Sequence, residues 1–586
     1  HEDEVIAAIF SYIDLIKKRG VTRSHFHELQ KVGFLHYLYY EPKPAVSQAN
    51  YYVGLMPNYP MPILNKVVYV TDDSEFDAIH INSILDALVL QNARIWRISP
   101  SEETDSQDPI FGTLYRDEAI SDKQAMRWLT PVPGLSLPKP NHFLPDSLAV
   151  AEKEITDEPV KVYSEEQSEA YFFGDDVLKD PVQIYGLELT LPPRKDVYQS
   201  TALTLLLDIL EDAVQAELYA AGMAGLDWTI GHSKQGISIY VYGLGDKQHL
   251  VMTKIIDHLL NLTDVSEETF QLIKESTLSV IKNINYAQPR SLLYNRLNAL
   301  LDVDGYAIND TEESIQTMTR KDLLDIYKYL MSDVSVVGFY YGNLNEEQAI
   351  AYHKKFDVFA HKGALKPVNP TELVRINDVK ESILFDTDHQ DFALWRYYQL
   401  PDNTYASRAK GLILSRMLAP SFFQQLRTME QIGYVVGCQY TRTLNWPAIS
   451  FIVQSPTMEP QNISKRVDAF LGRDDLLEEE AFETLRQSFI KDLKHPYQTM
   501  DEEFGFYWRQ IGLGQFDYQY KEEMIAAFND LTFDEIKQFY MDAIMTKERM
   551  LSLVTNQTEG DMIDFHDFKH KYADRYLDGR IFAKED

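Results

Sequence analysis

An internal repeat with a period of about 210 residues constrains the fold of this chain more than any other feature. Gly225 corresponds to Gly433 at an offset of 208 residues, and the alternating stretch Ile237–Val241 corresponds to Ile449–Val453 at an offset of 212. A solenoid repeat is far shorter, so each unit here has the size of a whole domain. We therefore expect at least two domains that share one fold.

The end of the repeat occurs three times, as an amphipathic helix followed by a β-rich run and a polar turn. The three copies run through Phe76–Ser99, Lys321–Val337 and Phe533–Val554. The first copy has no recognisable front half, and its earliest part, Phe10–Phe26, resembles the mid-repeat stretch Ile255–Phe270. The chain is therefore expected to begin in the middle of a domain.

Proline-rich breaks separate the copies. One stretch from Pro131 to Pro159 is rich in proline and then acidic, and a shorter break lies at Lys362–Pro370. Proline fixes φ and blocks a continuous helix, so both stretches are expected to be connectors. The expected division is 1–140, a connector at 141–163, then domains at 164–366 and 367–586. Alternating strands mixed with long amphipathic helices predict an α+β fold, with helices packed on antiparallel or mixed sheets.

The composition excludes several classes of function. With 89 acidic and 56 basic residues, the net charge of −33 would repel nucleic acid and anionic membranes. No run of eighteen apolar residues occurs, and the first residues are acidic where a signal peptide would be basic. Cys438 is the single cysteine, which excludes an internal disulfide framework and a multi-cysteine metal site. We expect neither a nucleic-acid nor a membrane partner.

Two segments imitate catalytic motifs without matching them. Gly231–Gly236 is similar to a nucleophile elbow, but its second glycine comes one residue too late, so a strand turn is predicted. His566 and His570 are four residues apart and could share a helical face that binds zinc. Their neighbouring carboxylate is Asp567 instead of a glutamate, and no third ligand is evident. A solvated C-terminal helix is the preferred interpretation, and we predict no metal site in this chain.

The most informative segment is Phe422–Val436. A helix that ends in Arg-Thr-Met-Glu-Gln turns at Gly433 into an apolar strand, which places Arg427 and Tyr434 near one helix-to-strand junction. A guanidinium and a phenol held together can bind a peptide carbonyl or an oxyanion. The residues alone also allow an ordinary packed junction, in which Arg427 forms a salt bridge.

Leu426–Tyr434 closely resembles a signature in the C-terminal domain of the family of pitrilysin and insulin-degrading enzyme. Gln91–Pro100 is similar to bacterial pitrilysin, Asn141–Asp146 resembles the interdomain connector of the family, and Ala224–Gln248 resembles its third domain. The resemblance spans nearly all 586 residues in the order of the family. It implies a zinc endopeptidase built from four similar α/β domains, two in each half, which enclose a chamber where peptides are degraded.

The resemblance also implies that this chain is the part of such an enzyme without the metal site. The zinc motif of the family, His-x-x-Glu-His with a distal glutamate, belongs to the first domain and does not occur in this sequence. Residues 1–140 would be the rear of domain 2, 164–366 domain 3 and 367–586 domain 4. Zinc would be bound by the N-terminal half, and this chain alone is expected to be inactive.

Arg427 and Tyr434 match the arginine and tyrosine that the C-terminal half of the family contributes to the active site. The tyrosine would donate a hydrogen bond to the substrate carbonyl as it becomes tetrahedral, and the arginine would orient the peptide backbone. The implied partners are the zinc-bearing N-terminal half and peptide substrates, and the implied compartment is the periplasm, as for bacterial pitrilysin. The alternative is a non-catalytic peptide-binding or assembly subunit of the same superfamily, which would have little need for both side chains.

Overall fold

The structure is a computed structural model, and it describes residues 2–39, 45–67, 69, 76–150, 152, 154–174, 180–284, 286–360, 372–558, 560–572 and 576–578. Its residues fall into two compact units. Unit 1 comprises His1–Ser147 with Tyr219–Leu226, and unit 2 comprises Leu148–Leu218 with Asp227–Asp586. The four-part division expected from the sequence stays a prediction, because these two units do not separate the later domains from each other.

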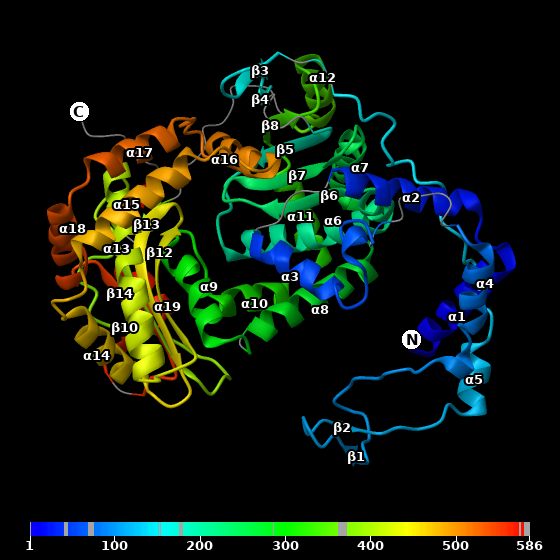
Figure 1. Ribbon diagram of the computed structural model, residues 1–586, viewed down its shortest axis with the longest axis horizontal. Coiled ribbons are helices and arrows are strands. Elements are labelled where there is room, and N and C mark those ends of the chain that lie inside the picture. The colour runs from blue at the N-terminus through cyan, green and yellow to red at the C-terminus, as the bar shows by residue number, and fades with distance from the viewer. Residues whose placement is uncertain are drawn as a thin grey trace. The chain divides into compact units, whose positions relative to one another are not determined.

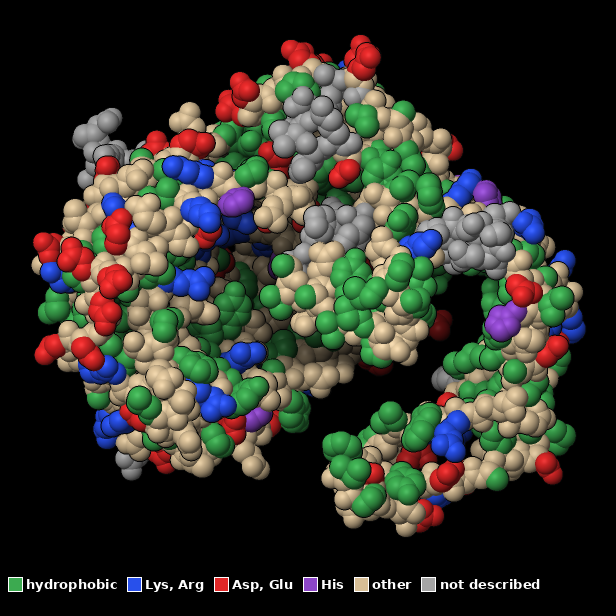
Figure 2. Space-filling model, viewed as in Figure 1, with side chains coloured by type: hydrophobic (Ala, Val, Ile, Leu, Met, Phe, Trp, Pro, Cys, Tyr) green, Lys and Arg blue, Asp and Glu red, His purple; other side chains and the backbone are tan. Residues whose placement is uncertain are grey.

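Unit 1 is mostly helical and has a small core. Its helices are α1 (Glu2–Arg19), α2 (Arg23–Leu38), α3 (Ala45–Leu55), α4 (Ala78–Ala87) and α5 (Asp122–Trp128), with short 3₁₀ turns at Met61–Ile63 and Leu90–Asn92. A two-stranded hairpin joins β1 (Ser106–Gln107) and β2 (Leu114–Tyr115). The core centres on three buried side chains, Ile6, Leu90 and Trp128. Figure 2 shows hydrophobic side chains at the surface over this hairpin, where Ile110 and Phe111 are 80% and 85% exposed.

The prediction of a β-rich run at the end of the first copy was wrong for this structure. The helix forms as α4, capped by the Asp77 carboxylate, which accepts from the backbone N–H groups of Ile79 and His80. Residues 93–99 form no strand, and Trp96 and Ile98 are 76% and 97% exposed. A strand is stable only when a neighbouring strand satisfies its backbone groups, and none of the described residues pairs with this segment.

Unit 2 contains two six-stranded sheets, and the first has the strand order β3-β4-β8-β5-β7-β6. Strands β4 and β8 pair in parallel, whereas the pairs β3–β4, β5–β8 and β5–β7 are antiparallel. The strands are β3 (Val160–Glu165), β4 (Ser168–Phe173), β5 (Val182–Thr190), β6 (Leu226–His232), β7 (Gly236–Leu244) and β8 (Ser335–Gly342). The helices are α6 (Val197–Met223), α7 (Gln248–Leu260), α8 (Glu267–Ile284), α9 (Pro289–Leu301), α10 (Ile308–Thr317), α11 (Arg320–Leu330) and α12 (Glu346–Phe356).

The second sheet has the order β12-β13-β11-β14-β10-β15, with β10 parallel to both of its neighbours. Its strands are β10 (Ser382–Phe385), β11 (Phe392–Gln399), β12 (Val435–Thr443), β13 (Trp446–Ser455), β14 (Met550–Thr555) and β15 (Met562–Ile563), and a separate pair joins β9 (Glu372–Val374) to β16 (Tyr576–Asp578). The helices are α13 (Tyr405–Phe423), α14 (Pro460–Leu471), α15 (Glu479–Lys494), α16 (Met500–Gly512), α17 (Tyr520–Asp530), α18 (Phe533–Tyr540) and α19 (Phe565–Tyr572).

The predicted repeat and fold class are confirmed element by element. The series β4-β5-α6-β6-β7-α7-α8-α9-α10-α11-β8 matches β10-β11-α13-β12-β13-α14-α15-α16-α17-α18-β14 in order and type. Both copies place helices on a mixed sheet, as Figure 1 shows. Among the described residues, none of the helices is both long enough and apolar enough to cross a membrane.

The two repeats exchange one helix each. Helix α9 belongs to the first repeat by sequence, but it packs on the second sheet, where Leu293 and Leu297 join a core with Trp395 of β11. Helix α16 belongs to the second repeat and packs on the first sheet, where Phe504 contacts Phe339 of β8 with ring centroids 4.9 Å apart. Figure 1 shows α16 lying against the strands of the first sheet. The exchange joins the two repeats into one packed unit.

Candidate functional site

The predicted site lies where α13 leaves its helical path and enters β12. Helix α13 continues into a π-helical turn, η5 (Gln424–Met429), and the chain then bends through Gln431, whose φ is 51°. The backbone N–H of Ile432 donates to the carbonyl of Leu426 over 3.0 Å, which closes the bend. Gly433 lies so close to the carbonyl of Gln454 that a Cβ atom would come within 1.8 Å of that oxygen. Only glycine therefore fits between the bend and β13.

Arg427 and Tyr434 lie together, as the junction predicts. The guanidinium carbon of Arg427 lies 5.5 Å from the ring centroid of Tyr434, which is the geometry of a cation–π contact. Tyr434 is 83% exposed. Within the part of the chain that the structure describes, Arg427 makes no ion pair and the Tyr434 hydroxyl makes no hydrogen bond. Both side chains are therefore available to a ligand, whereas the alternative of a salt-bridged Arg427 is not observed in these residues.

Glu430 fixes the bend that carries this pair. Its carboxylate accepts a hydrogen bond of 2.9 Å from Gln425 and forms a two-point contact with Arg466 of α14, at 2.7 and 2.5 Å. The Arg466 guanidinium holds the pKa of the Glu430 carboxyl below its usual value. The sequence showed Glu430 next to the pair, but it gave no sign of Arg466, which lies 36 residues away.

The first repeat also reaches the neighbourhood of Tyr434. Gln454, at the end of β13, pairs with Val435 in the sheet register. Its side-chain amide donates to the Asp391 carboxylate and to the Gln288 side-chain oxygen, each over 2.8 Å. Gln288 is the N-cap residue of α9, the helix that the first repeat contributes to this sheet. The exchanged helix therefore begins beside the predicted site.

The two segments that imitate catalytic motifs, at Gly231–Gly236 and at His566 and His570, have structural roles. Gly231–Gly236 turns β6 into β7, and the Ser233 hydroxyl accepts hydrogen bonds from the backbone N–H groups of Gln235 and Gly236. The predicted strand turn is confirmed. His566 and His570 are both exposed on α19, and the ring of His566 lies 3.4 Å from the Asp310 carboxylate.

The predicted solvated C-terminal helix is only half correct. Helix α19 buries Phe565, Phe568 and Tyr572 against α9 and the second sheet, while its histidine face is exposed. Across the described ranges, no group of three His, Cys, Asp or Glu side chains is arranged to hold a metal ion. The donor set of these residues therefore does not fit a zinc site.

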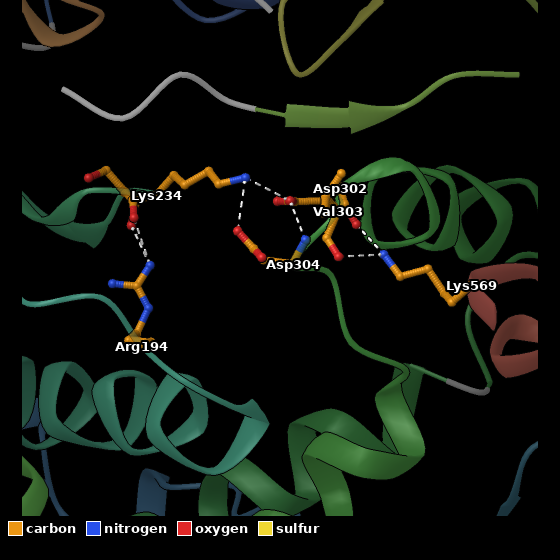
Figure 3. A network of polar contacts seen from close by, with 7 residues as sticks. Arg194, Lys234, Asp302, Val303, Asp304 and Lys569 are labelled. Atoms are coloured by element: carbon orange, nitrogen blue, oxygen red, sulfur yellow. Dashed lines mark hydrogen bonds and ion pairs between the residues drawn. The ribbon is translucent and has the colours of Figure 1, made fainter. Parts of the chain in front are cut away.

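Lys569, between the two histidines, binds the segment that ends α9 (Figure 3). Its amine donates to the backbone carbonyl of Asp302 and, over 3.1 Å, to that of Val303. Cations are favourable at a helix C-terminus, where backbone carbonyls have no helical partner. Burial lowers the pKa of the Lys569 amine to about 8.

A second lysine binds the same segment from the first repeat. The Lys234 amine lies 2.9 Å from the Asp302 carboxylate and 3.3 Å from that of Asp304. Arg194 holds the backbone of this lysine, since its guanidinium donates to the Lys234 carbonyl over 2.8 Å (Figure 3). We call Lys234, Lys569 and residues 302–304 the clasp, because one lysine from each repeat binds the segment that directly follows the C-terminus of α9.

Comparison with known proteins gives matches along nearly the whole chain. A family profile described as the middle or third domain of peptidase M16 matches residues 37–313, and one described as domain 4 of the C-terminal lobe of PqqF-like PQQ synthase matches residues 413–508. Human insulin-degrading enzyme is 24% identical over 567 residues, which cover 93% of this chain and 55% of that enzyme. The chain thus spans about half the length of the curated relatives that it matches.

Two solved structures share the fold. The crystal structure of pitrilysin aligns with a TM-score of 0.75 at 19% identity, covering 99% of this chain and 64% of pitrilysin. An inactive domain of peptidase M16 from Pseudomonas fluorescens aligns with a TM-score of 0.52 at 14% identity, covering 69% of this chain and 99% of that domain. At these identities the structural likeness establishes the fold alone.

Proposed function

The chain belongs to the family of pitrilysin and insulin-degrading enzyme, and from that premise we propose that it is the part of a zinc endopeptidase that carries no zinc motif and completes the active site. One observation carries the proposal. Tyr434 is exposed and held under the Arg427 guanidinium, in a chain without a His-x-x-Glu-His sequence. We also propose the periplasm as its compartment, on resemblance to pitrilysin.

In the proposed role, Tyr434 donates a hydrogen bond from its hydroxyl to the carbonyl oxygen of the scissile peptide. That bond strengthens as negative charge develops on the oxygen, so it favours the transition state over the bound substrate. Arg427 presents further N–H donors to the carbonyls of the peptide backbone and keeps the phenol ring in place. Zinc, held by the other part of the enzyme, would supply an activated water and polarise the same carbonyl.

The first experiment measures cleavage of a quenched fluorescent peptide with zinc in excess. The chain is assayed alone and then with the polypeptide of the same enzyme that bears His-x-x-Glu-His. We expect no cleavage by the chain alone and chelator-sensitive cleavage by the mixture. Chelator-sensitive cleavage by the chain alone would overturn the proposal and direct attention to His566 and His570.

A substitution tests the role of Tyr434 in the assembled enzyme. Tyr434→Phe should lower kcat by roughly 100-fold, the loss typical of one oxyanion donor, and should change KM little. Tyr219→Phe is the matched control, because Tyr219 is also strongly exposed, at 70%. A rise in KM at unchanged kcat would instead show that Tyr434 binds the substrate and the transition state equally.

The alternative function is a non-catalytic peptide-binding or assembly subunit. Its support is the match to a structure described as an inactive domain of peptidase M16. Such a subunit would bind a fluorescent peptide whether or not Arg427 and Tyr434 are present. We therefore expect Arg427→Ala to weaken peptide binding under the leading proposal and to leave it unchanged under the alternative.

A further inference from the structure

A cavity of about 240 Å³ lies in unit 2, where the end of β9, the end of β11 and the start of β14 meet. Arg375 directly follows β9, Gln399 ends β11, and Arg549 directly precedes β14. Clefts for drug-sized ligands occupy about 300 to 1,000 Å³, so this cavity fits a smaller molecule. None of the described residues that line it belongs to the junction with Arg427 and Tyr434.

Hydrogen bonds fix the walls of this cavity. The backbone N–H of Asp378 donates to the carbonyl of Glu548 over 2.8 Å. The backbone N–H of Gln399 donates to the carbonyl of Arg549 over 3.0 Å. The side chain of Gln399 is fully buried, accepts from the N–H of Ile376 over 2.9 Å, and donates to the carbonyl of the last residue of β9 over 3.1 Å. The cavity is therefore preformed, as small-molecule sites usually are.

Arg549 brings a buried cationic group to the lining. Its Nε atom is buried and has no hydrogen-bond partner among the described residues. Its contact with a carboxylate joins Nη1 to Glu548 over 3.8 Å, which is too long for a hydrogen bond. A buried guanidinium N–H without an acceptor costs free energy, because it has lost its water. An anion in the cavity would supply acceptors to this guanidinium.

Arg375 adds a second guanidinium, and its side chain is exposed. Within the described ranges of the chain, it forms neither an ion pair nor a side-chain hydrogen bond. The chain has 89 acidic and 56 basic residues, so carboxylates are abundant as partners for arginine. Two arginines nevertheless line this one small cavity with a single loose carboxylate contact between them.

The charge of the lining favours one kind of anion. Two guanidiniums and the Glu548 carboxylate leave one net positive charge. A carboxylate balances that charge, whereas a phosphate group carries roughly 1.5 to 2 negative charges near pH 7. The planar guanidinium also matches a carboxylate through two parallel hydrogen bonds. The lining further contains the buried apolar residues Ile376, Leu400 and Leu577, which suit a short apolar group on the ligand.

We propose that this cavity binds the carboxylate of a small organic acid with a short apolar side group, held by Arg375 and Arg549. The bound carboxylate links the segment after β9 to the segment before β14, which are far apart in the sequence. A free branched-chain acid and the C-terminal residue of a short peptide both present this chemistry. The site is separate from the junction at 422–436 and does not depend on the proposed function.

The first experiment is a ligand-observed NMR titration of the full chain with isovalerate. Isovaleramide has nearly the same shape without the charge, and we expect it to bind roughly tenfold more weakly or less. Inorganic phosphate should also bind more weakly than isovalerate. Equal binding of the amide, tighter binding of phosphate, or the absence of saturable isovalerate binding would overturn the proposal.

Substitutions test the two arginines separately. Arg549→Met and Arg375→Met should each weaken isovalerate binding by roughly tenfold or more. Arg416→Met, at another exposed arginine on α13, is the control and should leave the affinity unchanged. Circular dichroism checks that each variant is folded. Wild-type affinity in both Arg549→Met and Arg375→Met would overturn the proposal.

N-acetylleucine distinguishes the two sources of the carboxylate. It carries the apolar carboxylate of isovalerate together with the amide of a peptide. Tighter binding of N-acetylleucine than of isovalerate would assign the site to the C-terminal residue of a peptide, and weaker binding would assign it to a free acid. Both results support a carboxylate site, whereas binding of neither compound would overturn it.

Hydrogen exchange of the wild-type chain locates the site without any substitution. Isovalerate should slow the exchange of the Ile376 and Gln399 amides, because both donate hydrogen bonds within the walls of the cavity. Protection confined to other segments of the chain would overturn the assignment to this cavity.

Discussion

Helices α3 and α9 occupy the same place in the repeat, because α3 begins at Ala45 after α2 at Arg23, and α9 begins at Pro289 after α8 at Glu267; the two differ in burial. Six of the 13 residues of α9 are buried, whereas none of the 11 residues of α3 is. Both helices carry apolar side chains, so composition does not separate them. The difference is that α9 packs on a sheet, whereas none of the side chains of α3 is buried. A helix of this length gains most of its stability from such packing.

The contrast extends to the two units. Unit 1 has a core centred on three buried side chains, while unit 2 has large cores on the second sheet and a further one between the first sheet and α16. Hydrophobic burial is the main favourable term in folding, so unfolding of the free chain should report mainly on unit 2. The substitutions below test the contrast by changing one element at a time.

The largest effect is expected when the same charge is placed on both helices. Leu297→Asp puts a carboxylate into the core between α9 and the second sheet, where Leu297 is 1% exposed, and should lower the free energy of unfolding by at least about 5 kcal/mol. Val53→Asp on α3 should change it by less than about 0.5 kcal/mol. Urea denaturation followed by circular dichroism measures both. Similar losses in the two variants would contradict the view that α3 is unpacked.

The reciprocal helix is tested by Phe504→Ala in α16. Phe504 is 1% exposed and contacts Phe339 and Tyr240 of the first sheet, so its truncation should cost about 3 to 4 kcal/mol. Phe423→Ala, at a residue that is 48% exposed, is the control and should cost little. Hydrogen exchange should show that protection is lost first in β5 and β8, which belong to the other repeat. Loss confined to β11 and β14 would show that α16 stabilises its own repeat instead.

The repeat could be predicted from the sequence, but the exchange of helices could not. Gly225 and Gly433 both stand where a helix gives way to a strand, but for different reasons: the φ of Gly225 is 81°, whereas Gly433 packs against the carbonyl of Gln454. An apolar helical stripe, in contrast, has the same sequence pattern whichever sheet it covers. The pattern of α9 therefore does not indicate which sheet the helix packs against. The error at residues 93–99 has the same origin: Trp96 and Ile98 favour a strand locally, but strand formation needs a neighbour.

The candidate site, like the fold, was predictable from the sequence only where local structure determines it. Arg427 and Tyr434 are seven residues apart across a helix-to-strand junction, so their proximity follows from local structure. The contacts that hold the junction join distant parts of the chain, such as Glu430 with Arg466 and Gln454 with Gln288. These polar pairs depend on the completed fold and leave no periodic pattern in the sequence. The catalytic role of Arg427 and Tyr434 stays a prediction.

Two interactions stabilise α9: its packing on the second sheet and the contacts that the clasp makes at its C-terminal end. Substitutions in the clasp measure the second contribution separately. Lys569→Met leaves the carbonyls of Asp302 and Val303 without this donor and should cost about 1 to 3 kcal/mol at pH 7. Lys321→Met, at a lysine of α11 whose side chain is 86% exposed, is the control. Thermal unfolding measures both variants. An equal, small effect of the two would show that the sheet alone holds α9.

The effect of Lys569→Met on the free energy of unfolding should change with pH in a defined direction. The pKa of Lys569 is about 8 in the folded chain, below its ordinary value of 10.5, because burial and Lys234 outweigh Asp302 and Asp304. Between these values the unfolded chain binds more protons, so this lysine makes the free energy of unfolding rise with pH. The stability difference between wild type and Lys569→Met should therefore grow as the pH rises from the folded pKa toward the unfolded one, which thermal unfolding across that interval measures. A difference that shrinks with rising pH would contradict the lowered pKa.

The smallest effect is expected at the other side of the clasp. Lys234 pairs with Asp302 and Asp304, but its side chain is 23% exposed and Asp304 is 71% exposed, so water and salt screen the pairs. Lys234→Met should lower the free energy of unfolding by about 0.5 kcal/mol at low salt and by less at high salt. The double variant with Lys569→Met measures the coupling. If the losses in the free energy of unfolding are additive, each lysine binds residues 302–304 independently. A larger combined loss would show that the two repeats hold the C-terminal end of α9 jointly.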